Sequence, residues 1–274
     1  MGYLIRNDYK GLIQTDNLAQ ILGTDYTILT RAEAVAQSEI VSYLTQKYDT
    51  AKEFTSTLLY AYGVTRNAKD RVYLDATAYS GSSTYALNSL MLLNSMVYRC
   101  TTAITSPEGF VSGHWTLIGN QYDIYYASNP YPDWNYYTEY VTGNQIFYKN
   151  KTYTALSDNT ALAPDKNPTY WGSGTTYTVA GSIVPTDATK WTLGDNRNAE
   201  MVQYIVEVVL YHVHSRIAPR NIPNLRVKRY DEIISWLKNA SKGDWLTASL
   251  PKIQPNSGMR TRWGSKLAKQ NNTY

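Results

Sequence analysis

The stretch that decides the fold is AEMVQYIVEVVLYHVHSR, residues 199–216. Its apolar residues recur every three or four positions, which is the spacing that lines a helix face. The apolar face is broad, so we expect this helix to be packed on two sides. Pro219 and Pro223 end it. The residues of the face are Ala199, Val202, Ile205, Val206, Val209, Leu210 and Val213.

Helical periodicity continues on both sides of this stretch. A second helix is predicted from Asn224 to Ser241, with Gly243 suited to its C-terminal end. Far away in the sequence, Thr27 to Tyr48 has the same three and four residue spacing. One or two short helices are expected before Thr27. The two ends of the chain therefore predict one small helical bundle.

The middle of the chain has a different composition. Residues 76–196 hold 14 of the 26 tyrosines and four of the seven tryptophans. They carry eight acidic and five basic residues, while the flanks are strongly basic. From Thr55 the pattern alternates and favours strands or an ordered extended segment.

These patterns predict an α+β protein in which an all-β insertion of one or two small domains interrupts a helical domain. We divide the chain into four parts. They are residues 1–75, the N-terminal part of the helical domain with an extended segment; 76–196, the β insertion; 197–250, the C-terminal helical part; and 251–274, a basic extended arm.

The insertion contains a weak internal repeat. Aligned without gaps at an offset of 55 residues, Met91–Cys100 lies over Ile146–Ala155, and each copy has two strand patterns around a polar turn. Tryptophan-bearing strands follow, with Trp115 after the first copy and with Trp171 and Trp191 after the second. Repeated short strands separated by turns favour small β domains.

No pattern of reactive residues predicts an enzyme. His212 and His214 lie two apart on a predicted helix and point in different directions, so they cannot share a metal ion. Cys100 falls in a predicted strand with no histidine nearby in the sequence, so we expect an inert thiol. Nucleotide-binding and hydrolase motifs are absent. We expect no cofactor and no metal.

The tryptophans of the insertion allow three interpretations. Trp134, Trp171 and Trp191 could form the core of a β domain short of Leu and Ile, stack on sugar rings, or anchor a protein interface.

The basic arm also allows three interpretations: a solvated tail, a nucleic-acid contact or a docking peptide. Trp263, next to Arg262 and Gly264, favours a docking peptide whose indole enters a partner's pocket. The residues expected to dock are Arg260, Arg262, Trp263 and Lys266.

The C-terminal run MVQYIVEVVLYHVHSRIAPRNIPNLRVKRYDEIISWLKNASKGDWLTASLP, residues 201–251, resembles the head-tail adaptor proteins of tailed bacteriophages. The resemblance lies in a long apolar helix ending in a Tyr-His turn, a Pro-containing connection, a helix with a Trp-Leu pair and a Lys-Gly step. QSEIVSYLTQKYD, residues 37–49, is similar to the first long helix of that family, and RWGSKLAKQN, residues 262–271, to a tail that some members carry. Within the insertion, residues 146–156 and 164–171 are similar to small chitin-binding-type modules.

The adaptor resemblance implies a homo-oligomeric ring, of 12 copies in this family, that docks to the portal protein and continues the DNA channel toward the tail. DNA would pass without sequence-specific binding, and other neck or tail proteins would contact the insertion. The protein would then be part of the virion, assembled in the host cytoplasm and without a membrane contact. The alternatives are a sugar-binding virion protein and a DNA-binding protein that uses the basic arm. Ring packing is expected along Val202, Val206, Val209 and Val213.

Overall fold

The computed structural model describes residues 2–23, 25–217, 222–242 and 250–254. It confirms an α+β fold with a β insertion. The chain forms two compact units. Of the described residues, the first comprises those within 2–130 and 177–253, and the second comprises 131–176 and Gln254.

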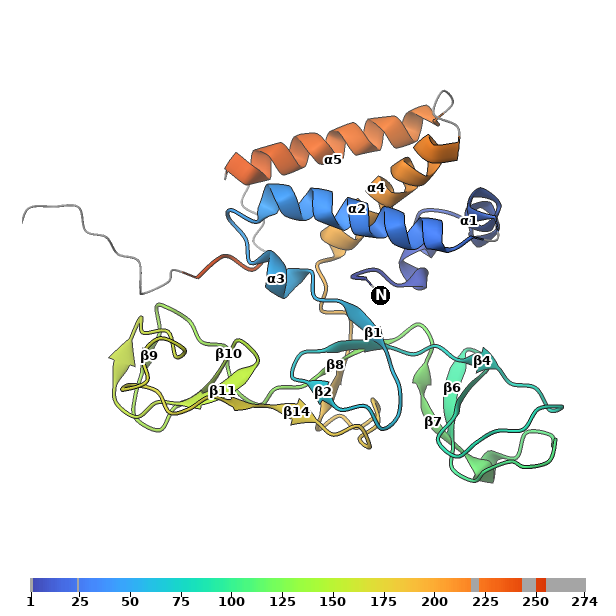
Figure 1. Cartoon of the computed structure of the whole chain (residues 1–274), viewed down its shortest axis with the longest axis horizontal. Helices are drawn as coiled ribbons and strands as arrows, with labels where there is room; N and C mark the ends of the chain where they lie inside the picture. Colours follow the sequence, from blue (N-terminus) through green and yellow to red (C-terminus); the bar gives the residue numbers. More distant parts are fainter. Residues whose placement is uncertain (1, 24, 218–221, 243–249, 255–274) are drawn as a thin grey trace, which may run out of the picture. The chain divides into compact units, whose positions relative to one another are not determined.

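The helical part of the first unit is built from both ends of the chain (Figure 1). Three long helices pack against one another, and the short helices η1 and α1 pack against one of them, α4. The helices are η1 (Arg6–Gly11), α1 (Thr15–Leu22), α2 (Thr27–Leu44), α3 (Thr50–Glu53), α4 (Ala199–Ile217) and α5 (Asn224–Lys242). The predicted helices 27–48, 199–216 and 224–241 are confirmed to within a few residues.

Helix α4 lies at the centre of this bundle. Val206, Val208, Val209 and Leu210 are four of its residues that are completely buried. Consecutive residues point to different sides of a helix, so α4 must be covered around most of its circumference. Helices α1, α2 and α5 all pack on it. The two-sided packing expected from the sequence is therefore made within one chain.

One buried carboxylate fixes the α4–α5 pair. Glu207 is 3% exposed and accepts hydrogen bonds from the guanidinium groups of Arg226 and Arg229, both on α5. A buried charge is tolerated only when it is paired in this way. The one acidic residue in the apolar run of α4 is thus matched by two basic residues on α5.

The β region contains three small modules, all of them in the described part of the chain. Module A lies in the first unit and consists of segments far apart in the sequence. Its main sheet has the order β1-β3-β8-β15, and β2 pairs with β14 beside it. Its strands are β1 (Thr57–Leu59), β2 (Arg66–Asn67), β3 (Arg71–Tyr73), β8 (Ile124–Ala127), β14 (Thr178–Val179) and β15 (Trp191–Leu193).

Modules B and C are continuous in sequence. Module B, residues 77–120, has the sheet order β4-β5-β6-β7, and module C, residues 131–176, has β10-β11-β13 with a β9-β12 pair. The strands of module B are β4 (Thr77–Ala78), β5 (Leu90–Leu93), β6 (Met96–Cys100) and β7 (Trp115–Asn120), with the short helix η2 (Ser112–His114). Those of module C are β9 (Glu139–Tyr140), β10 (Gln145–Tyr148), β11 (Lys151–Thr154), β12 (Asn159–Thr160) and β13 (Thr175–Thr176).

The repeat at an offset of 55 residues is confirmed by strand register. In module B Leu92 pairs with Val97, and in module C Phe147 pairs with Thr152. Each hairpin turns through two residues with positive φ, as tight hairpin turns require. These are Asn94 and Ser95 in module B, and Lys149 and Asn150 in module C.

Module A repeats the same backbone pattern. In each module a residue with positive φ precedes the hairpin and donates its backbone N–H to the carbonyl of the last residue of the second hairpin strand or, in module C, of the residue just after it, at 2.8 Å. These bonds run from Lys69 to Ala127, from Asn88 to Cys100 and from Gly143 to Ala155.

Two further features recur in all three modules. A tryptophan pairs with that acceptor residue: Trp191 with Ala127, Trp115 with Cys100 and Trp171 with Ala155. A short parallel segment also runs beside the first hairpin strand, and the residue after it donates to that strand. The donors are Tyr60 to Tyr73, Tyr79 to Leu92 and Trp134 to Phe147, at 2.8 to 2.9 Å. The three modules therefore share one backbone plan.

The equivalent residues of the three modules show at which loops of module A the other two are inserted. Module B lies between β3 and β8, where modules B and C themselves have a two-residue hairpin turn. Module C lies between β8 and β14, where module B has only the link from Cys100 to Ile104. Modules B and C are thus inserted in two loops of module A. The expected one or two β domains are three modules. Strand pairing begins at Thr57, within the stretch from Thr55 that was predicted to be extended, so the β region starts before residue 76.

Modules A and B share one hydrophobic core. Val97 and Ile118 of module B are completely buried and cluster with Val72, Tyr125 and Trp191 of module A. Module C has a core of its own, which includes Trp134, Tyr140, Ile146, Tyr153 and Trp171. The chain has Thr152 and Gly174 where module B has Val97 and Ile118, so module C has no apolar side chains at these two positions.

Two buried arginines join module A to the helices. Arg71 of β3 donates to the backbone carbonyls of Glu53 and Thr55 at the end of α3, at 2.8 to 3.1 Å. Arg197, just before α4, pairs with Asp8 of η1 and with Asp195, and its side chain is 1% exposed. Fully paired buried charges of this kind require both partners to stay in place. The helical part and module A are thus held as one unit.

Candidate functional site

The predicted docking arm lies outside the described residues. Arg260, Arg262, Trp263 and Lys266 belong to residues 255–274. The described start of the arm is extended: the backbone N–H of Asp49 donates to the carbonyl of Pro251 at 2.7 Å, and Lys252 pairs with Tyr48.

Three of the four predicted ring-packing residues are buried within the chain. Val206, Val209 and Val213 are at most 1% exposed, because α4 packs them against other helices of its own chain, so the prediction that these three contact another copy is wrong. Val202 is partly buried against the same core, and its predicted contact stays a prediction. Ring contacts would have to use surfaces other than the three buried valines.

The three candidate tryptophans are also core residues. Trp134, Trp171 and Trp191 are 5%, 1% and 2% exposed. The indole N–H of Trp171 donates to Leu162 at 2.9 Å, and that of Trp191 donates to Ile183 at 3.2 Å. A ring that stacks on a sugar needs an exposed face, so the prediction of a contact surface made by these three side chains is wrong. The core interpretation holds.

The side chains with reactive groups are separated and engaged locally. His212 pairs with Glu39 at 3.1 Å, and Nδ1 of His214 donates to the carbonyl of Leu210 at 2.7 Å. Cys100 is completely buried, and its Sγ lies 3.0 Å from the carbonyl of Thr102. Among the described residues no three His, Cys, Asp or Glu side chains are grouped so that they could hold a metal ion.

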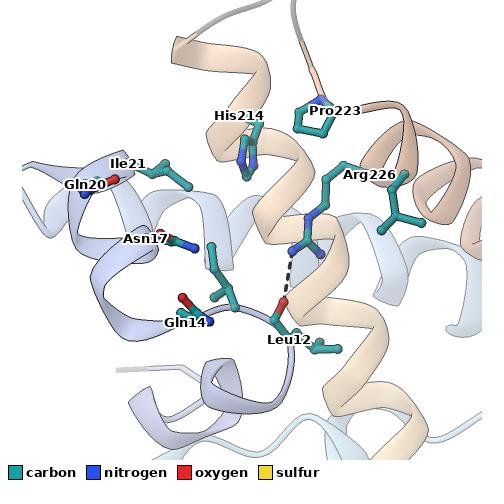
Figure 2. Close-up of a pocket in the computed structure, with 10 residues that line it drawn as sticks. Leu12, Gln14, Asn17, Gln20, Ile21, His214, Pro223 and Arg226 are labelled. Carbon is teal, nitrogen blue, oxygen red and sulfur yellow. Dashed lines mark hydrogen bonds between the residues drawn. The ribbon is translucent and has the colours of Figure 1, made fainter.

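A hollow of about 610 Å³ in the helical part is the candidate binding site (Figure 2). It lies between the segment from η1 to α1, the end of α4 and the start of α5. Its lining combines apolar side chains with amides and two basic groups. The lining residues are Leu12, Ile13, Gln14, Asn17, Gln20, Ile21, His214, Pro223, Leu225 and Arg226.

The two basic side chains of this hollow are held in place by hydrogen bonds to neighbouring residues. The Nδ1–H bond of His214 to the Leu210 carbonyl leaves Nε2 as the acceptor of the neutral ring. Arg226 donates to the carbonyl of Leu12 at 3.1 Å, drawn as the dashed line in Figure 2, and to Glu207. Among the described lining residues none has a carboxylate, thiol or hydroxyl group, and His214 is the side chain that could act as a base. The hollow can bind apolar and amide groups.

A second, shallower hollow lies on the outer face of α2. It is lined by Ala34, Val35, Ser38, Glu39 and Ser42, and Val35 is 54% exposed. Small side chains allow the backbone of another helix to approach closely. Helix α2 turns Val35 away from the core.

The comparisons with known proteins identify no family. No protein-family model matches the chain, and no curated protein sequence matches it. In the part of the chain that the structure describes, no helix is long and apolar enough to cross a membrane.

Proposed function

We propose that the chain is a non-enzymatic virion protein, a head-tail adaptor that forms a ring beneath the portal and continues the DNA channel toward the tail. The observation that carries this proposal is the joint core of the two segments that resemble adaptor proteins. Leu44 of the segment 37–49 and Val209 and Leu237 of the segment 201–251 are completely buried in one cluster. Segments more than 150 residues apart thus form one helical domain.

A closed ring needs two different surfaces on each copy, because each copy contacts its two neighbours differently. The helical part offers two hollows: the one in Figure 2 and the one on the outer face of α2. The first carries the exposed Leu225, and the second carries the exposed Val35. We assign these two surfaces to the ring contact, in place of the buried valines of α4.

The three β modules would contact other neck or tail proteins. Module C has three large apolar or aromatic side chains that are more than half exposed, which suits a contact surface. Tyr137 is 76% exposed, Val141 is 55% exposed and Leu156 is 53% exposed.

Light scattering on the full chain, alone and with the portal protein of the same virus, tests the proposal. We expect a complex with a ring of about 12 copies on the portal, visible by electron microscopy. A chain that neither assembles nor binds the portal would contradict the proposal. Salt-sensitive binding of duplex DNA in place of assembly would favour the DNA-binding alternative.

Surface variants test the assigned ring contact. Val35→Arg should abolish assembly and leave the helical content unchanged, because an exposed site accepts the charge in the monomer and an apolar contact does not. Leu87→Arg is the matched control, since Leu87 is 57% exposed and lies in module B. If both variants assemble equally well, the α2 surface is not part of the ring contact.

The arm is tested separately. Deletion of residues 259–269 should abolish attachment to the portal and leave the helical core folded, and Trp263→Ala should weaken attachment most among single changes. Unchanged attachment would show that the arm is not the docking element.

A further inference from the structure

One position distinguishes module A from its two copies. In module B Tyr85 pairs with Ile104, and in module C Tyr140 pairs with Asn159. The equivalent residue of module A is Arg66, which pairs with Val179. In modules B and C this tyrosine hydroxyl closes the preceding loop. It accepts the backbone N–H of Ser80 or Asn135 at 2.7 Å and donates to the carbonyl of the same residue.

Arg66 cannot repeat this arrangement, because a guanidinium has donors and no acceptor. Its NH2 group donates to the carbonyl of Leu59 at 2.9 Å, and its buried Nε has no partner. Modules B and C thus have a tyrosine hydroxyl with both of its hydrogen bonds formed, whereas module A has an arginine with an N–H donor that has no partner.

Two neighbouring side chains also have unused buried donors. The hydroxyl of Tyr60 is without a partner although the side chain is only 3% exposed, and Nε of Arg99 is without a partner as well. Arg99 lies on β6 of module B, where its NH1 group donates to Asn88 at 2.7 Å and its guanidinium lies 4.4 Å from the ring centre of Tyr62. Buried polar groups are nearly always satisfied, so a group of three orphan donors calls for a partner, which can be a water molecule, an ion or a ligand.

Both guanidinium groups act on the same phenol. Burial raises the pKa of Tyr60 to about 12, and the positive charges of Arg99 and Arg66 oppose that rise. Neither arginine forms an ion pair in the described structure. Burial raises the pKa of Asp70, and the positive charge of Arg66 opposes that rise. The Asp70 carboxylate accepts the backbone N–H of Asn67 at 2.8 Å. The cluster thus has two positive charges that no ion pair neutralises.

We propose that Tyr60, Arg66 and Arg99 form a binding site for a phosphate-type oxyanion at the junction of modules A and B. The site supplies only donors, and a tetrahedral oxyanion supplies only acceptors. Arginine is suited to this role because its planar fork matches the oxygens of a phosphate group. The bound group would neutralise the cluster where module B meets module A. This inference does not depend on the ring proposal.

Titration of the full chain with inorganic phosphate tests the site, by calorimetry and by thermal unfolding at constant ionic strength set with chloride. We expect saturable binding and a rise in melting temperature. Arg66→Gln and Arg99→Gln should each weaken binding by about tenfold or more, since charged hydrogen bonds are lost. Arg6→Gln is the matched control, because Arg6 is exposed and its loss changes the net charge equally.

Tyr60→Phe gives a readout that a purely structural role would not produce. Removing an unsatisfied buried hydroxyl should raise the melting temperature of the ligand-free chain and reduce the shift caused by phosphate. Arg99→Lys keeps the charge and provides a folded variant should the glutamine variants fail to fold, and it should bind phosphate more weakly than the unmodified chain.

A short single-stranded oligonucleotide distinguishes the source of the phosphate group. If it binds with the same dependence on Arg66 and Arg99, the site takes a phosphate of a nucleic acid; if only inorganic phosphate binds, the site takes the free ion. No difference between phosphate and chloride, or an equal loss of binding in Arg6→Gln, would overturn the proposal.

Discussion

Modules B and C are two copies of one backbone plan that have opposite relations to the rest of the chain. Module B contributes Val97 and Ile118 to a core shared with module A, whereas module C is a compact unit around its own core. Their hairpins have the same register and the same turn. The backbone plan therefore does not decide whether a module is integrated. The side chains on one face decide it, through the presence or absence of apolar groups at two positions.

The largest expected effect comes from removing module B, and the removal of module C is the matched comparison. Deletion of residues 129–176 joins Ser128 to Tyr177 and leaves as many residues from Ala127 to Val179 as module B has from Cys100 to Ile104. We expect the remaining chain to fold with a stability change of about 0.5 kcal/mol or less.

Deletion of residues 75–122, with Asn-Gly inserted between Leu74 and Asp123, restores the two-residue turn but uncovers the shared core. Loss of about four buried apolar side chains should cost about 6 to 10 kcal/mol, close to the whole stability of a domain. Denaturant unfolding followed by circular dichroism measures both variants. If the module B deletion unfolds as cooperatively as the full chain, the shared core is not what integrates the module.

Single core substitutions sharpen the comparison at a smaller scale. Ile118→Ala and Ile146→Ala each remove a side chain that is at most 1% exposed, and each should cost about 2 to 5 kcal/mol. Ile118→Ala should lower the stability of the helices as well, because its core belongs to the first unit. Ile146→Ala should shift only the transition of module C. Amide hydrogen exchange resolved by segment separates the two results, and coupled loss in both variants would argue against two independent units.

The sequence predicted the helices well because long stretches with one period have only one way to bury their apolar face. It also predicted the paired hairpins of modules B and C, because the repeat keeps the polar turn at Asn94 and Ser95 and again at Lys149 and Asn150. Module A was missed because its strands are separated by two inserted modules, so no continuous segment carries its pattern. The valines of α4 were assigned to contacts, and a contact role was left open for the tryptophans, because residue type does not reveal which neighbour covers a side chain.

The equivalent tryptophans of the two copies predict a difference in hydrogen bonding. The indole N–H of Trp171 donates to the carbonyl of Leu162 at 2.9 Å, whereas the indole N–H of Trp115 is buried without a partner. Substitution by Phe removes similar volume from both cores, but only Trp171→Phe leaves a carbonyl unsatisfied. Trp171→Phe should therefore cost about 1 to 2 kcal/mol more than Trp115→Phe. Equal losses of unfolding free energy would mean that the Trp115 N–H is satisfied by a water molecule.

The hairpin turns predict the smallest effect. Asn150 and Ser95 occupy the second turn position with φ of 62° and 65°, a region where glycine has no steric cost. Asn150→Gly should stabilise module C by about 0.5 kcal/mol and leave the first unit unchanged. Ser95→Gly should gain less, because the side chain of Ser95 contributes most to lowering the pKa of the Tyr122 phenol, and that interaction is lost with it. Segment-resolved hydrogen exchange can detect both changes, and a gain spread over the whole chain in Asn150→Gly would show that module C does not unfold on its own.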